Sequence, residues 1–208
     1  MFQKTALAHI PTLPSNPKVL FLLRDPVKRA FSQFVYSKYR LGRIPGEMTF
    51  RQYVEWSKLR GPQADVVSHS SYYKHISNWI ERMGADRLIV VQSEQLFRNP
   101  KDEMMRLCDL LGIEPAFYEG YDFPHRNESS GIRMRWLHRM AQRLQYAFPE
   151  SFKEKVLIPL YLKINADQRH KSETLSEEDA QWMRQMLKDD TDRLLNEFQH
   201  LRPELWYE

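Results

Sequence analysis

A short apolar run that leads directly into a helix start constrains the fold of this chain more than any other feature. The run covers Lys18 to Leu23, and its residues Val19 to Leu23 are apolar without a break. Such a run predicts a strand buried on both faces, as in a parallel sheet. Asp25 is a good helix N-cap, and Pro26 suits the first helical position. The sequence therefore predicts a strand that turns at once into a helix, as in α/β folds.

A second apolar run, Leu88 to Gln92, predicts another buried strand. Strands that alternate with helices favour a single α/β domain over residues 1–208, with a parallel sheet flanked by helices. The remaining pattern predicts helices from Pro26 to about Arg40, over 48–58, over 72–83, from Pro100 to 111, over about 132–165 and from Ser176 onward, with loops over 61–70 and 123–131.

Composition narrows the class of ligand. Lys and Arg number 31 against 27 Asp and Glu, a net charge of +4 that fits an anionic ligand better than nucleic acid. Cys108 is the one cysteine, and no His/Cys cluster has metal-ligand spacing, so we expect no disulfide within the chain and no metal. The chain has no apolar run near the ~20 residues of a membrane span, and its N-terminus does not resemble a signal peptide. We therefore expect a soluble, cytoplasmic protein without a membrane partner.

The strand–helix junction is the candidate site. Arg24 stands at the carboxyl end of a predicted parallel strand, where open α/β sheets bind ligands. The N-terminus of the helix that follows favours anions, and Ser32 lies about two turns into that helix. A guanidinium fork with a hydroxyl suits a phosphate. The alternative is that Arg24 forms an ion pair and that Ser32 is an ordinary surface serine.

The pattern Arg24-Asp-Pro-x-x-Arg-Ala-x-Ser32 after a Lys-Val-Leu-Phe-Leu-Leu strand resembles the 3′-phosphate-binding segment of the sulfotransferases. These enzymes use 3′-phosphoadenosine-5′-phosphosulfate (PAPS) as sulfuryl donor and release 3′-phosphoadenosine-5′-phosphate (PAP). The resemblance implies a P-loop-like α/β fold, with Arg24 and Ser32 on the 3′-phosphate of the nucleotide. Further segments follow the family's order: Ser71-Tyr-Tyr-Lys-His75, Glu94-x-Leu96, Asn99-Pro100, Leu110-Leu-Gly112 and Leu205-Trp206.

The resemblance also implies an activity: transfer of a sulfuryl group from PAPS to a hydroxyl or amine of a carbohydrate or small metabolite. It implies that Tyr73 stacks on adenine, that Arg126 and Gly131 belong to a nucleotide lid, and that Lys4 lies near the transferred group. The residues alone leave open that Tyr73 is a packing residue and that Lys4, Arg126 and Gly131 lie on the surface. A non-catalytic relative that binds adenine nucleotide or a partner protein is the alternative function.

One part of the family pattern is not found in the sequence. The family's 5′-phosphosulfate loop precedes the Arg-Asp-Pro strand by several tens of residues, and only 17 residues precede Lys18. No Gly-Lys-Thr-like loop occurs elsewhere, and Gln3 stands where the family has Glu. We therefore expect this chain to be an N-terminally truncated form of a longer sulfotransferase, without its first strand–loop–helix.

Overall fold

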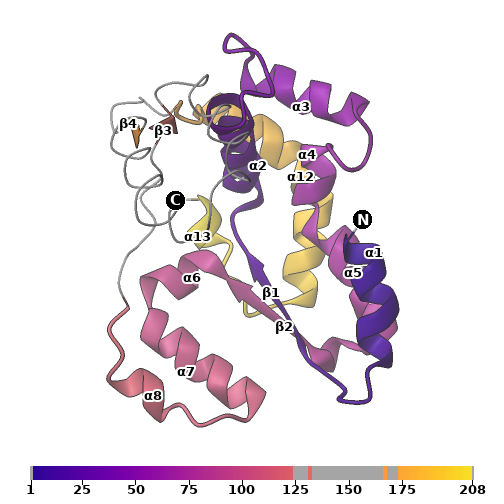
Figure 1. The fold of residues 1–208 in the computed structure, drawn as a ribbon, viewed down its shortest axis with the longest axis vertical. Helices are drawn as coiled ribbons and strands as arrows, with labels where there is room; N and C mark the ends of the chain where they lie inside the picture. The colour runs from indigo at the N-terminus through magenta and orange to yellow at the C-terminus, as the bar shows by residue number, and fades with distance from the viewer. Residues whose placement is uncertain (1, 124–130, 133–165, 168–172, 208) are drawn as a thin grey trace, which may run out of the picture. The chain divides into compact units, whose positions relative to one another are not determined.

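The computed structural model describes residues 2–123, 131–132, 166–167 and 173–207 (Figure 1). Two compact units divide the chain between them. The first unit comprises Met1–Phe31, Phe50–Pro124 and Leu175–Glu208, and the second comprises Ser32–Thr49 and His125–Thr174. The single domain over residues 1–208 stays a prediction.

The first unit is built on a two-stranded parallel sheet. Strand β1 (Val19–Leu23) pairs with strand β2 (Leu88–Gln92), with Val19 opposite Leu88 and Leu23 opposite Gln92. Both strands that the sequence predicted are confirmed, and the long stretch between them supplies the helical crossover that a parallel pair requires. The two strands lie side by side in Figure 1, and their carboxyl ends meet at one edge of the sheet.

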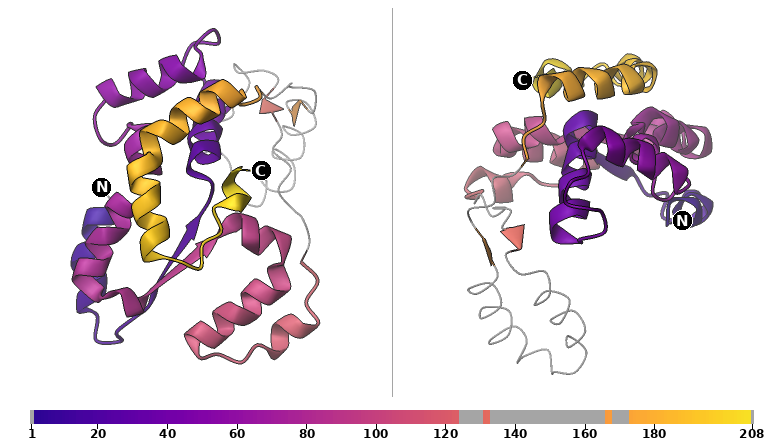
Figure 2. Two further views of the ribbon diagram at one scale, coloured as in Figure 1. Left: turned by 180° about the vertical axis from the view of Figure 1, so that it is seen from behind. Right: turned by 90° about the horizontal axis from the view of Figure 1, so that it is seen from above.

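One face of this sheet packs against helices α1 (Phe2–His9), α5 (Tyr72–Met83) and α12 (Glu177–Glu197). Figures 1 and 2 both show α5 and α12 side by side. The apolar stripe predicted for residues 72–83 is confirmed, because it faces this core. The cluster includes Leu23, Ile76, Trp79, Met83, Leu88, Val90, Leu194, Phe198, Leu201 and Trp206.

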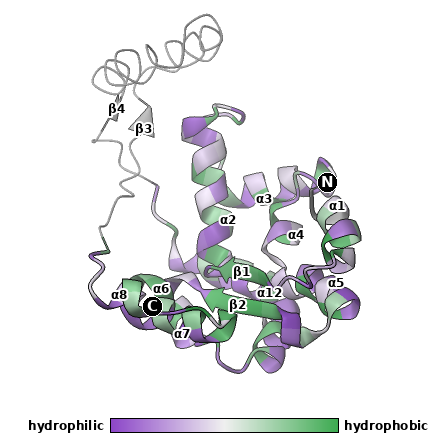
Figure 3. Ribbon diagram, turned by 60° about the horizontal axis from the view of Figure 1, so that its bottom comes forward, coloured by the Kyte–Doolittle hydropathy of each residue, from purple (hydrophilic) through white to green (hydrophobic). Residues whose placement is uncertain are grey.

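The other face of the sheet is covered on β2 only. Ile89 and Val91 pack against Leu107 and neighbouring side chains of α6 (Ser93–Arg98) and α7 (Pro100–Leu111). Leu20 and Leu22 point to the same face from β1 but remain 45% and 51% exposed. The prediction that β1 is buried on both faces is therefore wrong, since no helix among the described residues covers β1 on this side. Figure 3 shows the hydrophobic colour of both strands.

The predicted helices are largely confirmed. Helix α2 (Pro26–Val35) begins at Pro26 and continues into a π-helical turn, η2 (Tyr36–Arg40). Helix α3 (Phe50–Leu59) matches the prediction, and Gly84 and Gly112 end α5 and α7 with φ angles of 82° and 68°. The shorter helices are η1 (Ile10–Thr12), α4 (Val66–Ser70), η3 (Ala85–Arg87), α8 (Ala116–Glu119) and α13 (Glu204–Tyr207).

Two local predictions need correction. Helix α4 occupies part of the predicted loop over 61–70, because the Asp65 side chain accepts hydrogen bonds from the N–H groups of Val67 and Ser68. Asn99 precedes α7 as predicted, but its side chain makes no capping hydrogen bond. None of the helices among the described residues combines the length and apolarity that a membrane crossing requires.

The second unit contains η2 and a short antiparallel pair, β3 (Gly131–Ile132) with β4 (Ala166–Asp167). Lys38 is buried there; its Nζ donates to the Met48 carbonyl at 2.9 Å and forms an ion pair with Glu173. The Tyr39 hydroxyl donates to the same carboxylate at 2.7 Å. The basic helices predicted over about 132–165 lie, beyond Ile132, outside the described residues.

Candidate functional site

Arg24 directly follows β1, at the carboxyl edge of the sheet, and its side chain is exposed. Within the described part of the chain, its guanidinium has no hydrogen-bond or ion-pair partner, so the alternative of a structural ion pair has no support there. Ser32 is also exposed and lies in α2, as predicted. The boundary between the units falls just before Ser32, so the two residues belong to different units.

The N-terminus of α2 is not the anion site that the sequence predicted. The carboxylate oxygen Oδ1 of Asp25 accepts hydrogen bonds from the N–H groups of Val27, at 2.7 Å, and Lys28, at 3.1 Å. The Arg29 N–H donates to the Asp25 carbonyl at 2.8 Å, and Pro26 has no N–H. The first N–H groups of the helix are therefore already used by the cap. The prediction that the Arg24 side chain binds an anion does not depend on these N–H groups.

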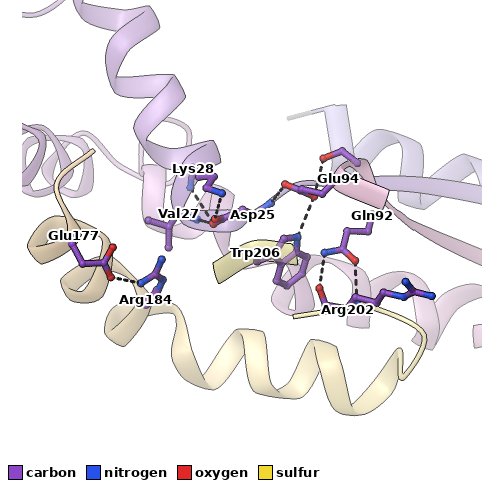
Figure 4. Close-up of polar contacts among 10 residues, drawn as sticks. Asp25, Val27, Lys28, Gln92, Glu94, Glu177, Arg184, Arg202 and Trp206 are labelled. Carbon is purple, nitrogen blue, oxygen red and sulfur yellow. Dashed lines mark hydrogen bonds and ion pairs between the residues drawn. The ribbon is translucent and has the colours of Figure 1, made fainter. Parts of the chain in front are cut away.

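The Arg24–Asp25 segment is held by a carboxylate from the neighbouring strand end. Oε1 of Glu94, in α6 just after β2, accepts the Asp25 backbone N–H at 2.8 Å. Its other oxygen, Oε2, accepts the indole N–H of Trp206, in α13, at 3.2 Å. Figure 4 shows Glu94 between Asp25 and Trp206. The carboxyl ends of both strands are thereby joined to the C-terminal segment.

Asp25 itself is a buried carboxylate, 2% exposed. Burial raises its pKa, and the nearby Glu94 charge acts in the same direction, against the hydrogen bonds from Lys28 and Val27 and the Lys28 charge. Oδ2 of Asp25 has no hydrogen-bond partner among the described residues and lies 3.9 Å from Lys28 Nζ. Asp25 is therefore the helix cap that the sequence predicted.

Arg29 and Tyr72 lie behind this segment. Arg29 is half-buried and donates to the Ser70 hydroxyl at 3.2 Å. Burial lowers the pKa of Arg29, against the effects of the Tyr72 and Tyr53 side chains. Burial raises the pKa of Tyr72 to about 12, although the Arg29 charge and a backbone hydrogen bond with Arg24 oppose it. Tyr72 is therefore a protonated, structural phenol at neutral pH.

Tyr73 is the second residue of α5 and is half-buried. The rings of Tyr72 and Tyr73 both pack against the core cluster described above. Asp190 of α12 caps α5, since its carboxylate accepts the N–H groups of Tyr73 and Lys74 at 2.9 and 2.8 Å. The adenine-stacking role of Tyr73 stays a prediction.

The roles of the other predicted site residues stay predictions. Lys4 lies in α1, but its side chain is outside the described part of the structure. Arg126 is outside the described residues, and Gly131 begins β3 in the second unit. Within the described ranges, no group of three or more His, Cys, Asp or Glu side chains is placed to hold a metal ion.

A cavity of about 350 Å³ borders Asp25 on the α12 side of the first unit. Its lining combines the carboxylates of Asp25 and Asp192 with the cations Arg184 and Lys188. The Arg184 guanidinium donates from Nη1 to Glu177 at 2.8 Å and lies over the Tyr207 ring, while its buried Nε has no hydrogen-bond partner among the described residues. This mixed charge does not fit a phosphate, and the anion site at Arg24 stays a prediction.

Sequence reasoning missed the supporting residues. Glu94 contacts a backbone group 69 positions earlier in the chain, and Asp190 one 117 positions earlier. No spacing rule links such distant positions. The only sequence signal was the Glu94-x-Leu96 resemblance, which carries no geometry.

A parallel strand pair, with an exposed arginine after β1 and a capped helix directly behind it, defines an α/β protein. The particular family follows from comparison with known proteins. The family description "Sulfotransferase domain" matches residues 4–194, and the chain belongs to this family.

Individual relatives agree with this assignment. Heparan sulfate glucosamine 3-O-sulfotransferase 3B1 of Mus musculus is 26% identical over 113 residues, which is 53% of this chain and 28% of the relative. Sulfotransferase 2A2 of Rattus norvegicus is 31% identical over 104 residues, 49% of this chain and 34% of the relative. 3-alpha-hydroxysteroid sulfotransferase of Cavia porcellus is 24% identical over 129 residues, 58% of this chain and 42% of the relative. The matches thus span well under half of each relative.

The fold comparison reaches further along the chain. The crystal structure of a sulfotransferase from Alicyclobacillus acidocaldarius superposes with a TM-score of 0.57 and 17% identity, over 92% of this chain and 57% of that one. This similarity shows the fold: a parallel α/β architecture of the P-loop-like sulfotransferase type, as the sequence resemblance implied.

Proposed function

We propose that this protein binds PAPS through Arg24 and takes part in the transfer of its sulfuryl group to an acceptor. The observation that carries the proposal is the exposed Arg24 guanidinium, without a partner among the described residues, at the carboxyl end of β1 in a chain of the sulfotransferase family. A guanidinium that is not used by the protein retains its full set of donors for a phosphate.

Each predicted residue has a role in this proposal. The Arg24 fork binds the 3′-phosphate, and the Ser32 hydroxyl donates to the same group. Tyr73 contacts the adenine, Arg126 and Gly131 contribute to the cover over the nucleotide, and Lys4 lies near the group that is transferred. PAPS supplies the activated sulfuryl group, and PAP is the product. Sulfuryl transfer resembles phosphoryl transfer, so cationic side chains that hold the donor in line stabilise the transition state.

The acceptor is proposed only as a class. The relatives' names refer to heparan sulfate glucosamine and to a hydroxysteroid, which are a carbohydrate and a small alcohol. We propose an acceptor of that range, with a hydroxyl or amine as nucleophile. The fold does not select among such acceptors, because the same scaffold carries many substrate specificities.

The test measures what the 3′-phosphate contributes to the binding affinity. PAP and adenosine 5′-monophosphate (AMP) differ only in that phosphate, so isothermal titration calorimetry with both measures what it contributes. The wild-type chain is expected to bind PAP more tightly than AMP, and Arg24→Ala to lose about 10- to 100-fold of PAP affinity with AMP affinity unchanged. Arg82→Ala, an equally exposed arginine in the last turn of α5, is the matched control.

Two results would overturn the proposal. One is a wild-type protein that binds PAP and AMP equally. The other is equal loss of PAP affinity in the Arg24 and Arg82 variants, which would mean that only general positive charge matters. Release of PAP from PAPS with a hydroxyl acceptor, measured with the same variants, tests the transfer step separately.

A further inference from the structure

One carboxylate connects three elements of the first unit at the carboxyl edge of the sheet. Glu94 enters α6 directly after β2, so it stands beside the end of β1. Oε1 accepts the Asp25 N–H at 2.8 Å, and Oε2 accepts the Trp206 indole N–H at 3.2 Å and the Ser93 hydroxyl at 3.1 Å. All the donors are neutral, and the Glu94 carboxylate makes no ion pair within the described part of the chain.

The Asp25 N–H belongs to the peptide group that follows Arg24. Because that peptide group is planar, a bond to its N–H fixes the orientation of the whole group. On its other side, Asp25 is fixed by its bonds to the N–H groups of Val27 and Lys28. The backbone on the carboxyl side of Arg24 is thereby held between Glu94 and α2. The direction in which the Arg24 side chain leaves the chain follows from that backbone.

Trp206 keeps the Glu94 carboxylate in place. Its ring is 1% exposed and belongs to the core cluster, so its indole N–H has a fixed position. A carboxylate that accepts from a fixed indole with one oxygen has little freedom left for the other. In Figure 4, dashed lines join Glu94 to both Trp206 and Asp25.

We propose that Glu94 is a positioning residue for the nucleotide: it sets the Arg24 guanidinium on the 3′-phosphate without touching the phosphate itself. This inference rests on the proposed function of Arg24. In this inference the length of the Glu94 side chain matters, because the carboxylate must reach the Asp25 N–H to position Arg24. The negative charge of Glu94 lies close to a phosphate site and would by itself weaken anion binding.

Two conservative variants separate length from charge. Glu94→Gln removes the charge but keeps the length and one acceptor oxygen for the Asp25 N–H, while its NH2 group replaces the oxygen that accepts from Trp206. Glu94→Asp keeps the charge but is one methylene shorter and does not reach the Asp25 N–H. We expect Glu94→Gln to retain the preference for PAP over AMP, and Glu94→Asp to lose about tenfold of PAP affinity with AMP affinity unchanged.

The outcomes distinguish this inference from the proposed function. If Arg24→Ala abolishes the preference for PAP while Glu94→Asp keeps it, the positioning role is wrong and the proposed function stands. If Glu94→Gln loses the preference and Glu94→Asp keeps it, charge rather than reach matters, which also overturns the inference. If the wild-type chain has no preference, the proposed function fails first. Circular dichroism and thermal midpoints of each variant show whether a loss reflects the site or the fold.

Discussion

Replacing Gln92 by Met removes one of the contacts that hold the C-terminal segment to the end of β2. Gln92 is 2% exposed, and its side-chain amide forms two hydrogen bonds with one residue of that segment. Nε2 donates to the Arg202 carbonyl at 2.9 Å, and Oε1 accepts the Arg202 N–H at 3.0 Å. Met has nearly the same volume, so the substitution removes both bonds without opening a large cavity.

The expected cost follows from these two bonds. A typical intramolecular hydrogen bond contributes a net ~0.5–1.5 kcal/mol, so the pair contributes about 1–3 kcal/mol. The loss rises toward the upper limit if the backbone groups of Arg202 stay away from water after the substitution. Against a total stability of about 5–15 kcal/mol, typical of native proteins, this loss is easily measured.

Urea unfolding followed by tryptophan fluorescence is the assay. Gln92→Met is expected to lower the midpoint without changing the slope, since the surface exposed on unfolding stays the same. Gln63→Met, at an exposed loop position, is the control. An unchanged midpoint for Gln92→Met, or an equal decrease in the control, would refute the argument that this amide holds the C-terminal segment.

Three further predictions concern the site and the core. Ser32→Ala should weaken PAP binding a few-fold and leave AMP binding unchanged by calorimetry; equal loss for both ligands would contradict its role. Burial raises the folded-state pKa of Asp25 above its unfolded value of 3.8, so its contribution to stability falls as pH rises between the two values. Asp25→Asn, which keeps the capping oxygen, should therefore be more stable than wild type at pH 7, with the advantage vanishing at pH 3 in thermal melts. Leu194→Ala, at a position 1% exposed, should cost ~2–5 kcal/mol in urea unfolding, whereas exposed Leu59→Ala should cost little.

Local sequence patterns correctly predicted the strands and helix starts that depend on neighbouring residues. The β1 and β2 runs and the Asp25 cap depend on a few neighbouring residues, and they are confirmed. The exposed face of β1 was missed for a different reason. Leu20 and Leu22 are as apolar as Ile89 and Val91, so only the position of α7 decides which pair is covered. Sequence gives the hydrophobicity of a strand but not the placement of the helix that covers it.

The same distinction explains the site. The sequence pointed to Arg24 because Arg24 directly follows a predicted strand. Whether the N–H groups of α2 are free depends on the hydrogen bonds of the Asp25 side chain, which the sequence does not show. A helix N-terminus after a strand favours anions only if its N–H groups are free, and an Asp at the N-cap uses them. In this chain Asp25 marks the start of α2 in the sequence. The same Asp25 side chain occupies N–H groups of α2 that could otherwise bind an anion. Under the proposed function, an Arg-Asp-Pro junction shifts anion recognition from the helix backbone to the arginine. Glu94, which holds the segment after Arg24 from 69 positions away, is then part of the proposed site.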